Sequence, residues 1–191
     1  MSRLYRVFSH DPNAAADEPG GVLFIPTQGG GRIDNPDLYA VRYLGDSPAG
    51  ACAEVFNSGK YRQDWSSEML RPHPKLPKRR RALAWFDLPD NAPICNLDDP
   101  RELTKQRMRP SRVIARDYAT TQQWARKLFR QGRWDGVRWW SYHDARWASI
   151  GLWRNPKIVG YGIETLTIDH PALHEAADAL QIRFKRKSEV R

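Results

Sequence analysis

Short apolar segments, separated by Gly, Pro, Asp and Asn, run along this chain and constrain its fold more than any other feature. Segments with alternating bulky residues predict β-strands, and three amphipathic or small-residue segments predict helices. The predicted strands cover residues 4–8, 22–25, 38–44, 82–88, 92–97, 137–140, 150–153 and 163–168, and the predicted helices cover 49–56, 120–131 and 171–180. Because strands outnumber helices and do not alternate with them regularly, we expect an α+β fold, not a doubly wound sheet.

The length of 191 residues favours one domain, which we place at residues 1–191 with a core at about 3–180. Residues 60–81 are polar, proline-rich and basic, so we interpret them as a long surface excursion, and 183–191 as a basic tail. The apolar runs fall far short of the roughly 20 residues that a membrane-spanning helix needs. The first residues carry no signal peptide pattern.

Cys52 and Cys95 lie far apart without a CxxC pattern. This pattern favours free, buried thiols in a reducing cytosol, with a single disulfide as the alternative. We therefore expect a cytoplasmic protein.

The net charge of +9 indicates a polyanionic partner, such as a nucleic acid, a membrane surface, an acidic protein or a phosphorylated ligand. Basic residues form one block at 78–81 and another in the tail. Such runs are usually solvated loops and termini. No zinc finger, helix-turn-helix or RNA-binding signature accompanies the charge, which makes direct nucleic-acid binding the weaker interpretation.

Four residues are candidates for a site, although each has an ordinary structural explanation. Arg32 follows three glycines, and an arginine in a close-approach loop offers a planar fork for a diphosphate. Glu54 lies in a predicted helix of small and apolar residues, so it faces either solvent or a polar pocket. Tyr43 lies in a predicted strand, where core packing is the default role. Ser141 ends a predicted strand, a common place for site residues, without the GxSxG context of an acyl hydrolase.

Other patterns are weaker. His170 and His174 have helical spacing but lack a third ligand for a metal ion. His143 and Cys52 show no spacing typical of a Cys–His pair. The tryptophans between 134 and 153 could stack nucleobases, but a core strand pair explains most of them.

Taken in order, these residues resemble the RES domain family, named for an arginine, a glutamate and a serine. The stretch Gly30-Gly31-Arg32, then Asn35-Pro36, Tyr43-Leu44 and Ala53-Glu54, is similar to the first family signature, and positions 32, 43 and 54 are evenly spaced by eleven residues. Asp135-Gly136-Val137-Arg138-Trp139-Trp140-Ser141 is similar to the segment that carries the family's serine.

The opening strand of the family contributes a second basic residue, which corresponds to Arg6 here. Ile33-Asp34 replaces the single tryptophan usual after the arginine, and the segment from 142 to 153 is unusually aromatic. Both departures bear on substrate preference, and neither removes a signature residue.

The resemblance implies a fold similar to ADP-ribosyltransferases, with a mixed β-sheet core flanked by short helices. It also implies a toxin that consumes NAD⁺ and is paired with an Xre-type antitoxin. In that interpretation Glu54 stabilises the ribose cation, Arg32 and Arg6 hold the diphosphate, Tyr43 orients nicotinamide, and Ser141 positions the ribose or the amide. No metal is required. Inorganic phosphate or water is the expected acceptor, and transfer to a protein or a non-catalytic nucleic-acid module are the alternatives.

Overall fold

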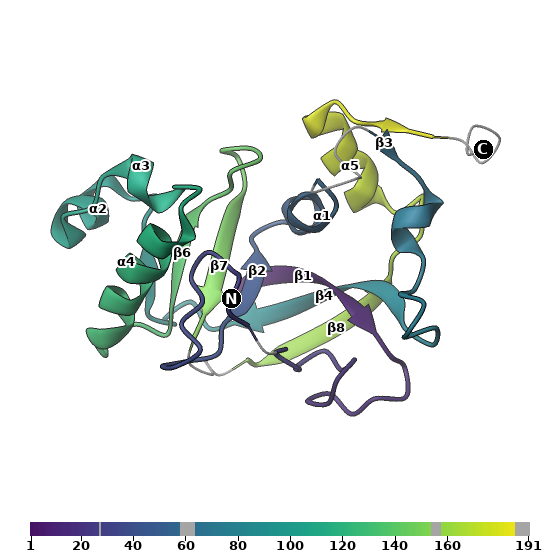
Figure 1. The fold of residues 1–191 in the computed structure, drawn as a ribbon, viewed down its shortest axis with the longest axis horizontal. Coiled ribbons are helices and arrows are strands. Elements are labelled where there is room, and N and C mark those ends of the chain that lie inside the picture. Colours follow the sequence, from purple (N-terminus) through teal and green to yellow (C-terminus); the bar gives the residue numbers. More distant parts are fainter. Residues whose placement is uncertain (27, 58–63, 154–157, 186–191) are drawn as a thin grey trace.

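Seven strands form one sheet in the order β5-β6-β7-β2-β1-β4-β8 (Figure 1) in a computed structural model that describes residues 1–26, 28–57, 64–153 and 158–185. β5 and β6 are parallel, whereas the other neighbouring strands are antiparallel. This mixed sheet confirms the predicted α+β class. The strands are β1 (Ser2–His10), β2 (Arg42–Gly45), β4 (Arg80–Leu88), β5 (Ile94–Asn96), β6 (Gly136–Trp140), β7 (Ala148–Leu152) and β8 (Gly160–Thr165).

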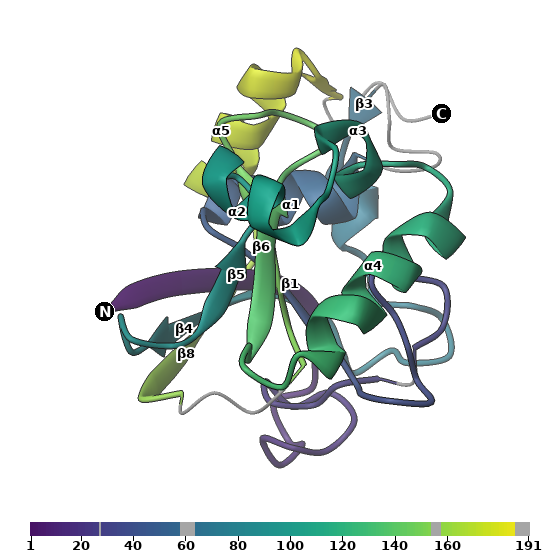
Figure 2. The same cartoon turned by 90° about the vertical axis from the view of Figure 1, so that its left-hand side faces the viewer.

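The helices divide into two groups. Near β6 lie α2 (Pro100–Gln106), α3 (Pro110–Val113) and α4 (Tyr118–Arg130), as Figures 1 and 2 show. The second group, α1 (Pro48–Phe56) and α5 (Pro171–Leu180), packs together above β1. Each group covers its own apolar cluster. Trp124 and Trp139 lie in the cluster under α4, and Phe56 and Leu173 lie in the cluster under α1 and α5.

Helix α1 forms where the sequence predicts it. The hydroxyl of Ser47 accepts a hydrogen bond from the Gly50 N–H at 2.9 Å, and Pro48 occupies the first helical turn. Small buried residues at 49–53 let the helix approach the sheet closely. The result is that Glu54 is held on a short, firmly anchored helix.

β1 and β2 are paired at a single register position, Tyr5 opposite Gly45. β2 pairs over four residues with β7, and β1 pairs along its whole length with β4. The two halves of the sheet therefore diverge between β1 and β2. A cavity opens at that divergence, beneath α1.

A third apolar cluster lies on the sheet face opposite α1, where Val22 packs against Leu4, Phe8 and Phe86. The predicted strand at 22–25 is wrong, because this segment is a turn followed by irregular chain. Its carbonyls bond to side chains instead of to a neighbouring strand: Arg42 donates to the Leu23 oxygen at 2.7 Å and Arg6 to the Phe24 oxygen at 2.9 Å.

The predicted strand at 38–44 is also too long, since β2 begins only at Arg42. Tyr39 pairs back with Asn35 in an isolated bridge that turns the chain before the strand. The remaining strand predictions are confirmed within a few residues. Helices α2 and α3 escaped prediction because they are short, although the Asp99 cap and the proline after it mark the start of α2.

The surface excursion predicted for 60–81 is wrong for part of its length. Trp65, in β3 (Asp64–Trp65), is fully buried, and Met69, in the 3₁₀ helix η2 (Ser67–Leu70), is 2% exposed. Both side chains complete the cluster under α1 and α5 because their apolar area outweighs the polarity of the surrounding sequence. Residues 60–63 lie outside the described residues, and Lys75 and Lys78 are exposed as expected.

The predicted basic tail likewise starts with structure. β9 (Arg183–Phe184) pairs in parallel with β3. The centroid of the Phe184 ring lies 5.9 Å from the centroid of the Trp65 ring. Residues 186–191 lie outside the described part of the chain.

Cys52 and Cys95 are buried and free, as predicted. Among the described residues, no helix combines the length and apolarity required to cross a membrane.

Candidate active site

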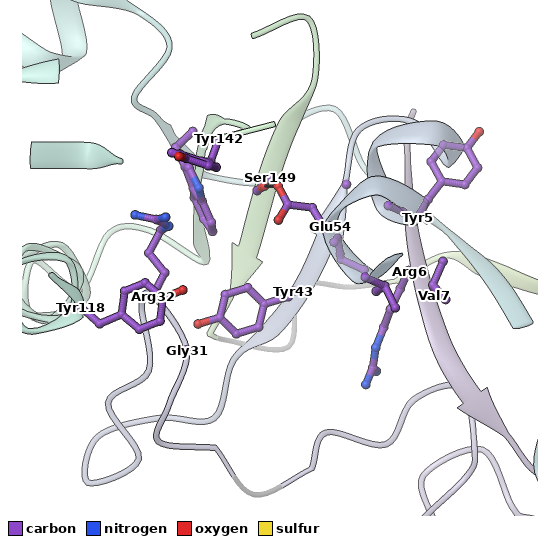
Figure 3. Close-up of a pocket in the computed structure, with 15 residues that line it drawn as sticks. Tyr5, Arg6, Val7, Gly31, Arg32, Tyr43, Glu54, Tyr118, Tyr142 and Ser149 are labelled. Carbon is purple, nitrogen blue, oxygen red and sulfur yellow. Dashed lines mark hydrogen bonds between the residues drawn. The ribbon is translucent and has the colours of Figure 1, made fainter. Parts of the chain in front are cut away.

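A cavity of about 320 Å³ lies between the diverging strands β1 and β2 and the helix α1 (Figure 3). Residues from six parts of the chain reach it, namely β1, the loop before β2, β2 itself, α1, the start of α4 and the β6–β7 segment. Arg32, Tyr43 and Glu54, which the sequence singles out, all line it. The fold therefore brings together residues that are evenly spaced in the sequence.

Glu54 is bound by two serines. The Ser141 hydroxyl donates to Glu54 Oε1 at 2.7 Å, and the Ser149 hydroxyl donates to the same oxygen at 3.1 Å. Both serines are buried, whereas the Glu54 side chain is 40% exposed. In Figure 3 the carboxylate extends toward Ser149. Ser141 thus contacts Glu54 but does not line the cavity, whereas the sequence assigned it to positioning the ribose or the amide.

A histidine, His143, completes the surroundings of Glu54. Its Nε2 lies 3.6 Å from Glu54 Oε2, and its side chain is 13% exposed. Asn57, at the C-terminus of α1, lies with Nδ2 at 3.1 Å from His143 Nδ1. From the sequence, His143 was weighed only as a partner for Cys52. Its position two residues after Ser141 is the sequence feature that could have identified it as a site residue.

Burial raises the pKa of Glu54, but the close contact with His143 and the hydrogen bonds from Ser141 and Ser149 outweigh burial. The pKa of Glu54 is therefore below its ordinary value. A carboxylate that opens to the cavity and stays ionised can stabilise positive charge that develops beside it.

Arg32 reaches the cavity from the glycine loop, on the side away from Glu54. Its guanidinium donates to the Ala115 carbonyl at 2.7 Å and lies 5.5 Å from the centre of the Tyr118 ring. These contacts fix Arg32 against the segment that joins α3 to α4. The donors not used by carbonyls are available to an anion in the cavity, since a guanidinium carries five N–H groups.

The Tyr43 hydroxyl holds the loop that carries Arg32. It donates to Asp34 Oδ1 at 2.6 Å and accepts a hydrogen bond from the Ile33 N–H at 3.0 Å. Asp34 also accepts from the Gly29 and Gly31 N–H groups at 2.9 and 2.6 Å. Burial, followed by the Asp34 hydrogen bond, raises the pKa of Tyr43. Asp34, one of the residues that depart from the family signature, therefore has a structural task that the sequence did not reveal.

Arg6 is placed differently from the other predicted site residues. It lines the cavity, but Figure 3 shows its guanidinium directed away from Glu54, toward the chain segment where Phe24 accepts its hydrogen bond. Burial, followed by the charge of Arg42, lowers the pKa of Arg6 to about 10. The cation that faces the same space as Glu54 and Tyr43 is Arg32.

The weaker sequence candidates have structural roles. His170 caps α5 through its Nδ1 at 3.2 Å from the Ala172 nitrogen, and its Nε2 lies 3.3 Å from Glu164. Trp139, Trp147 and Trp153 are buried in the core, as the core interpretation predicted. Within the described residues, no group of three His, Cys, Asp or Glu side chains is arranged to hold a metal ion.

The cavity thus combines an ionised carboxylate, a tethered arginine and aromatic side chains. Figure 3 places the Tyr43 ring between Arg32 and Glu54. This arrangement suits a ligand that has an anionic part near Arg32 and develops positive charge near Glu54.

Comparisons with known proteins agree with this fold. A crystal structure, "Crystal structure of the M.tuberculosis MbcT-MbcA toxin-antitoxin complex", contains a chain that is 15% identical, with a TM-score of 0.57, and the match covers 94% of this chain and 89% of that one. No curated protein matches the sequence. The RES domain matches residues 3–174, which include Arg32, Tyr43, Glu54 and Ser141. The chain belongs to the RES domain family.

Proposed function

We propose that this chain cleaves NAD⁺ at the bond between nicotinamide and ribose. The observation that supports the proposal most is the Glu54 carboxylate, which is kept ionised by its hydrogen bonds and opens into the same cavity as Arg32 and Tyr43. Cleavage of this bond passes through a ribose with oxocarbenium character, as glycoside hydrolysis does. A fixed anion beside the ribose lowers the energy of that transition state.

In the proposed reaction, Glu54 accepts hydrogen bonds from the ribose hydroxyls and faces the developing positive charge. The electron pair of the breaking bond returns to the pyridinium nitrogen, so that nicotinamide leaves as a neutral molecule. Arg32 binds the diphosphate through its free N–H groups, and Tyr43 supplies a ring face for nicotinamide. Ser141 and Ser149 hold Glu54 for this task.

Arg6 enters the proposal with a smaller part than the family resemblance implies. Its guanidinium points away from Glu54, and its hydrogen bond goes to the Phe24 carbonyl. It contributes to the diphosphate site through its charge, and direct contact with the diphosphate belongs to Arg32.

The acceptor of the ADP-ribosyl group is proposed to be inorganic phosphate or water, with a protein side chain as the alternative. With phosphate, the new bond forms between a phosphate oxygen and the ribose carbon, and one proton is released to solvent. The products would then be nicotinamide and ADP-ribose-1″-phosphate.

A direct experiment incubates the purified protein with NAD⁺, with and without phosphate, and follows nicotinamide by chromatography. Mass spectrometry of the second product distinguishes ADP-ribose-1″-phosphate, ADP-ribose and a modified protein. Absence of nicotinamide release under all these conditions, from correctly folded protein, would refute the proposed function.

We further propose that the chain is a cytoplasmic toxin that binds an Xre-type antitoxin. Free thiols at Cys52 and Cys95 support a reducing compartment. The solved chain with a similar fold comes from a toxin–antitoxin complex. Co-purification with the product of an adjacent antitoxin gene, together with loss of turnover in the complex, tests this proposal.

A further inference from the structure

His143 has no part in the reaction proposed above, although it lies against the central carboxylate. Its Nε2 is 3.6 Å from Glu54 Oε2, while both serines bind the other oxygen, Oε1. The backbone N–H of His143 also donates to the Ser141 hydroxyl oxygen at 3.1 Å. One residue therefore contacts Glu54 with its ring and directs Ser141 with its backbone.

The contact with Asn57 fits one neutral tautomer of the His143 ring. Asn57 Nδ2 is an amide donor, so His143 Nδ1, at 3.1 Å, accepts. A neutral imidazole has one N–H group, which must then lie on Nε2, the nitrogen that faces Glu54. Asn57 is the C-cap of α1 and follows Glu54 by three residues.

Contacts at both oxygens restrict the carboxylate more than contacts at one. The terminal torsion of a glutamate side chain is broad, so a carboxylate held only through Oε1 can still rotate. A donor near Oε2 defines the plane of the group. Misplacement by about 1 Å can cost roughly 100-fold in rate at a reacting centre.

We propose that His143 is a positioning residue that fixes the plane of the Glu54 carboxylate through Nε2–H, and that Asn57 selects this tautomer. The inference rests on the proposed function, because the carboxylate is positioned for NAD⁺ cleavage. Neither residue touches the substrate.

The first test compares kcat and KM for nicotinamide release by wild type, His143→Ala and His143→Gln. We expect kcat of His143→Ala to fall by about 10- to 100-fold. KM should stay within about twofold, because Arg32 and Tyr43 are unchanged. His143→Gln should recover part of kcat, because its amide can donate to Glu54. A similar kcat for His143→Ala and wild type would overturn the inference and leave the proposed function intact.

His170→Ala is the matched control. His170 has a similar exposure, 14%, and also lies beside a glutamate, Glu164, but it is remote in sequence from the residues of the cavity. The substitution removes the N-cap of α5 as well, so it tests the fold more severely. The kcat of His170→Ala should match that of wild type. An equal loss of kcat in His143→Ala and His170→Ala would show that His143 has only a structural role.

A double-mutant cycle tests the place of Asn57. Because Asn57 acts through His143, Asn57→Ala should lower kcat in the wild-type background and have a much smaller effect in the His143→Gln background. Equal effects in both backgrounds would contradict the proposed relay.

Nitrogen-15 NMR of the histidine side chains reads the tautomer without any turnover. We expect His143, assigned from the signal lost in His143→Gln, to carry its proton on Nε2 at neutral pH. A proton on Nδ1 alone would overturn the inference even if NAD⁺ were not the substrate. Absence of nicotinamide release by wild type would overturn the proposed function instead.

Discussion

At the scale of single residues, the side chains that line the cavity are held in place by hydrogen bonds to neighbouring residues. Tyr43 and Asp34 hold the loop that carries Arg32, and the serines hold Glu54. The order of Arg32, Tyr43, Glu54 and Ser141 in the sequence predicted one site; the first three line the cavity, and Ser141 is hydrogen-bonded to Glu54. The sequence did not predict Ser149 or His143, because their contacts with Glu54 join residues far apart in the chain. It also did not predict the role of Asp34, although the contacts of Asp34 with Gly29, Gly31 and Tyr43 are local.

The glycine loop offers a stability test with an internal control. A Cβ at Gly31 would lie 2.5 Å from the Tyr43 hydroxyl and 2.8 Å from the Asp34 carboxylate, whereas a Cβ at Gly30 would meet nothing within 4 Å. We expect Gly31→Ala to lower the free energy of unfolding by about 1–3 kcal/mol through overpacking. Gly30→Ala should have little effect. Urea unfolding of the two variants would reveal equal effects if the loop were less tightly packed than described.

The lowered pKa of Glu54 predicts how the stability of the fold changes with pH. A carboxyl whose folded pKa is below its ordinary pKa stabilises the fold at pH values above the ordinary pKa and loses this contribution as pH falls through the folded pKa. The stability of wild type relative to Glu54→Gln should therefore be greater at pH 7 than at pH 3. Urea unfolding at both pH values measures it, and a difference that does not change with pH would contradict the described hydrogen bonds.

Burial raises the pKa of both the Cys52 and Cys95 thiols to about 12. Few thiolates are then present at neutral pH, and the thiolate is the reactive form. We expect iodoacetamide at pH 8 to leave both cysteines unmodified in the folded protein and to modify both in guanidinium chloride. Rapid modification of either one in the native state, seen by mass spectrometry, would be inconsistent with its burial.

At the scale of elements, the helices with strong local signals were predictable. α5 matches its predicted bounds, and α1 and α4 differ by at most two residues at either end. The errors occur where contacts distant in sequence decide the structure. Arg6 and Arg42 bond to the carbonyls of the predicted strand at 22–25, and Trp65 draws a polar segment into the core.

The N-cap of α1 is expected to matter because this short helix carries Glu54. Ser47→Ala removes the hydrogen bond to the Gly50 N–H and should destabilise the protein by about 1 kcal/mol. Ser111→Ala, at an exposed position in α3, is a matched control and should have little effect. Thermal unfolding followed by circular dichroism compares them, and similar melting temperatures would show that α1 does not need its cap.

At the scale of the whole molecule, the positive charge is concentrated on one group of helices. Residues 100–133 contain ten cationic and two acidic residues, a balance of +8 out of +9 for the chain. A groove of about 520 Å³ lies on α4 beside the end of α2, and no carboxylate lines it. The cations that line it are Arg107, Arg112, Arg126, Lys127 and Arg130. The sequence did not predict this surface, because its cations are spread over residues 107–130, whereas the more conspicuous basic runs are at 78–81 and 183–191.

This concentration of charge predicts where an antitoxin with an acidic surface would bind. Reversing Arg107 and Arg130 to glutamate should weaken the proposed antitoxin by at least about tenfold at low salt, and less at high salt. Reversing the exposed Lys75 and Lys78 removes the same charge and should change affinity much less. Equal losses from the two double variants, measured by titration calorimetry, would show that only net charge matters.

The most direct test of the proposed function is the rate of nicotinamide release by Glu54→Gln at saturating NAD⁺. Glutamine keeps the shape of the side chain and can still accept from Ser141 and Ser149, but it carries no negative charge. We expect a loss of at least about 100-fold in kcat relative to wild type, because the charge that stabilises the ribose cation is gone. A glutamine variant that releases nicotinamide as fast as wild type would contradict the central role of Glu54.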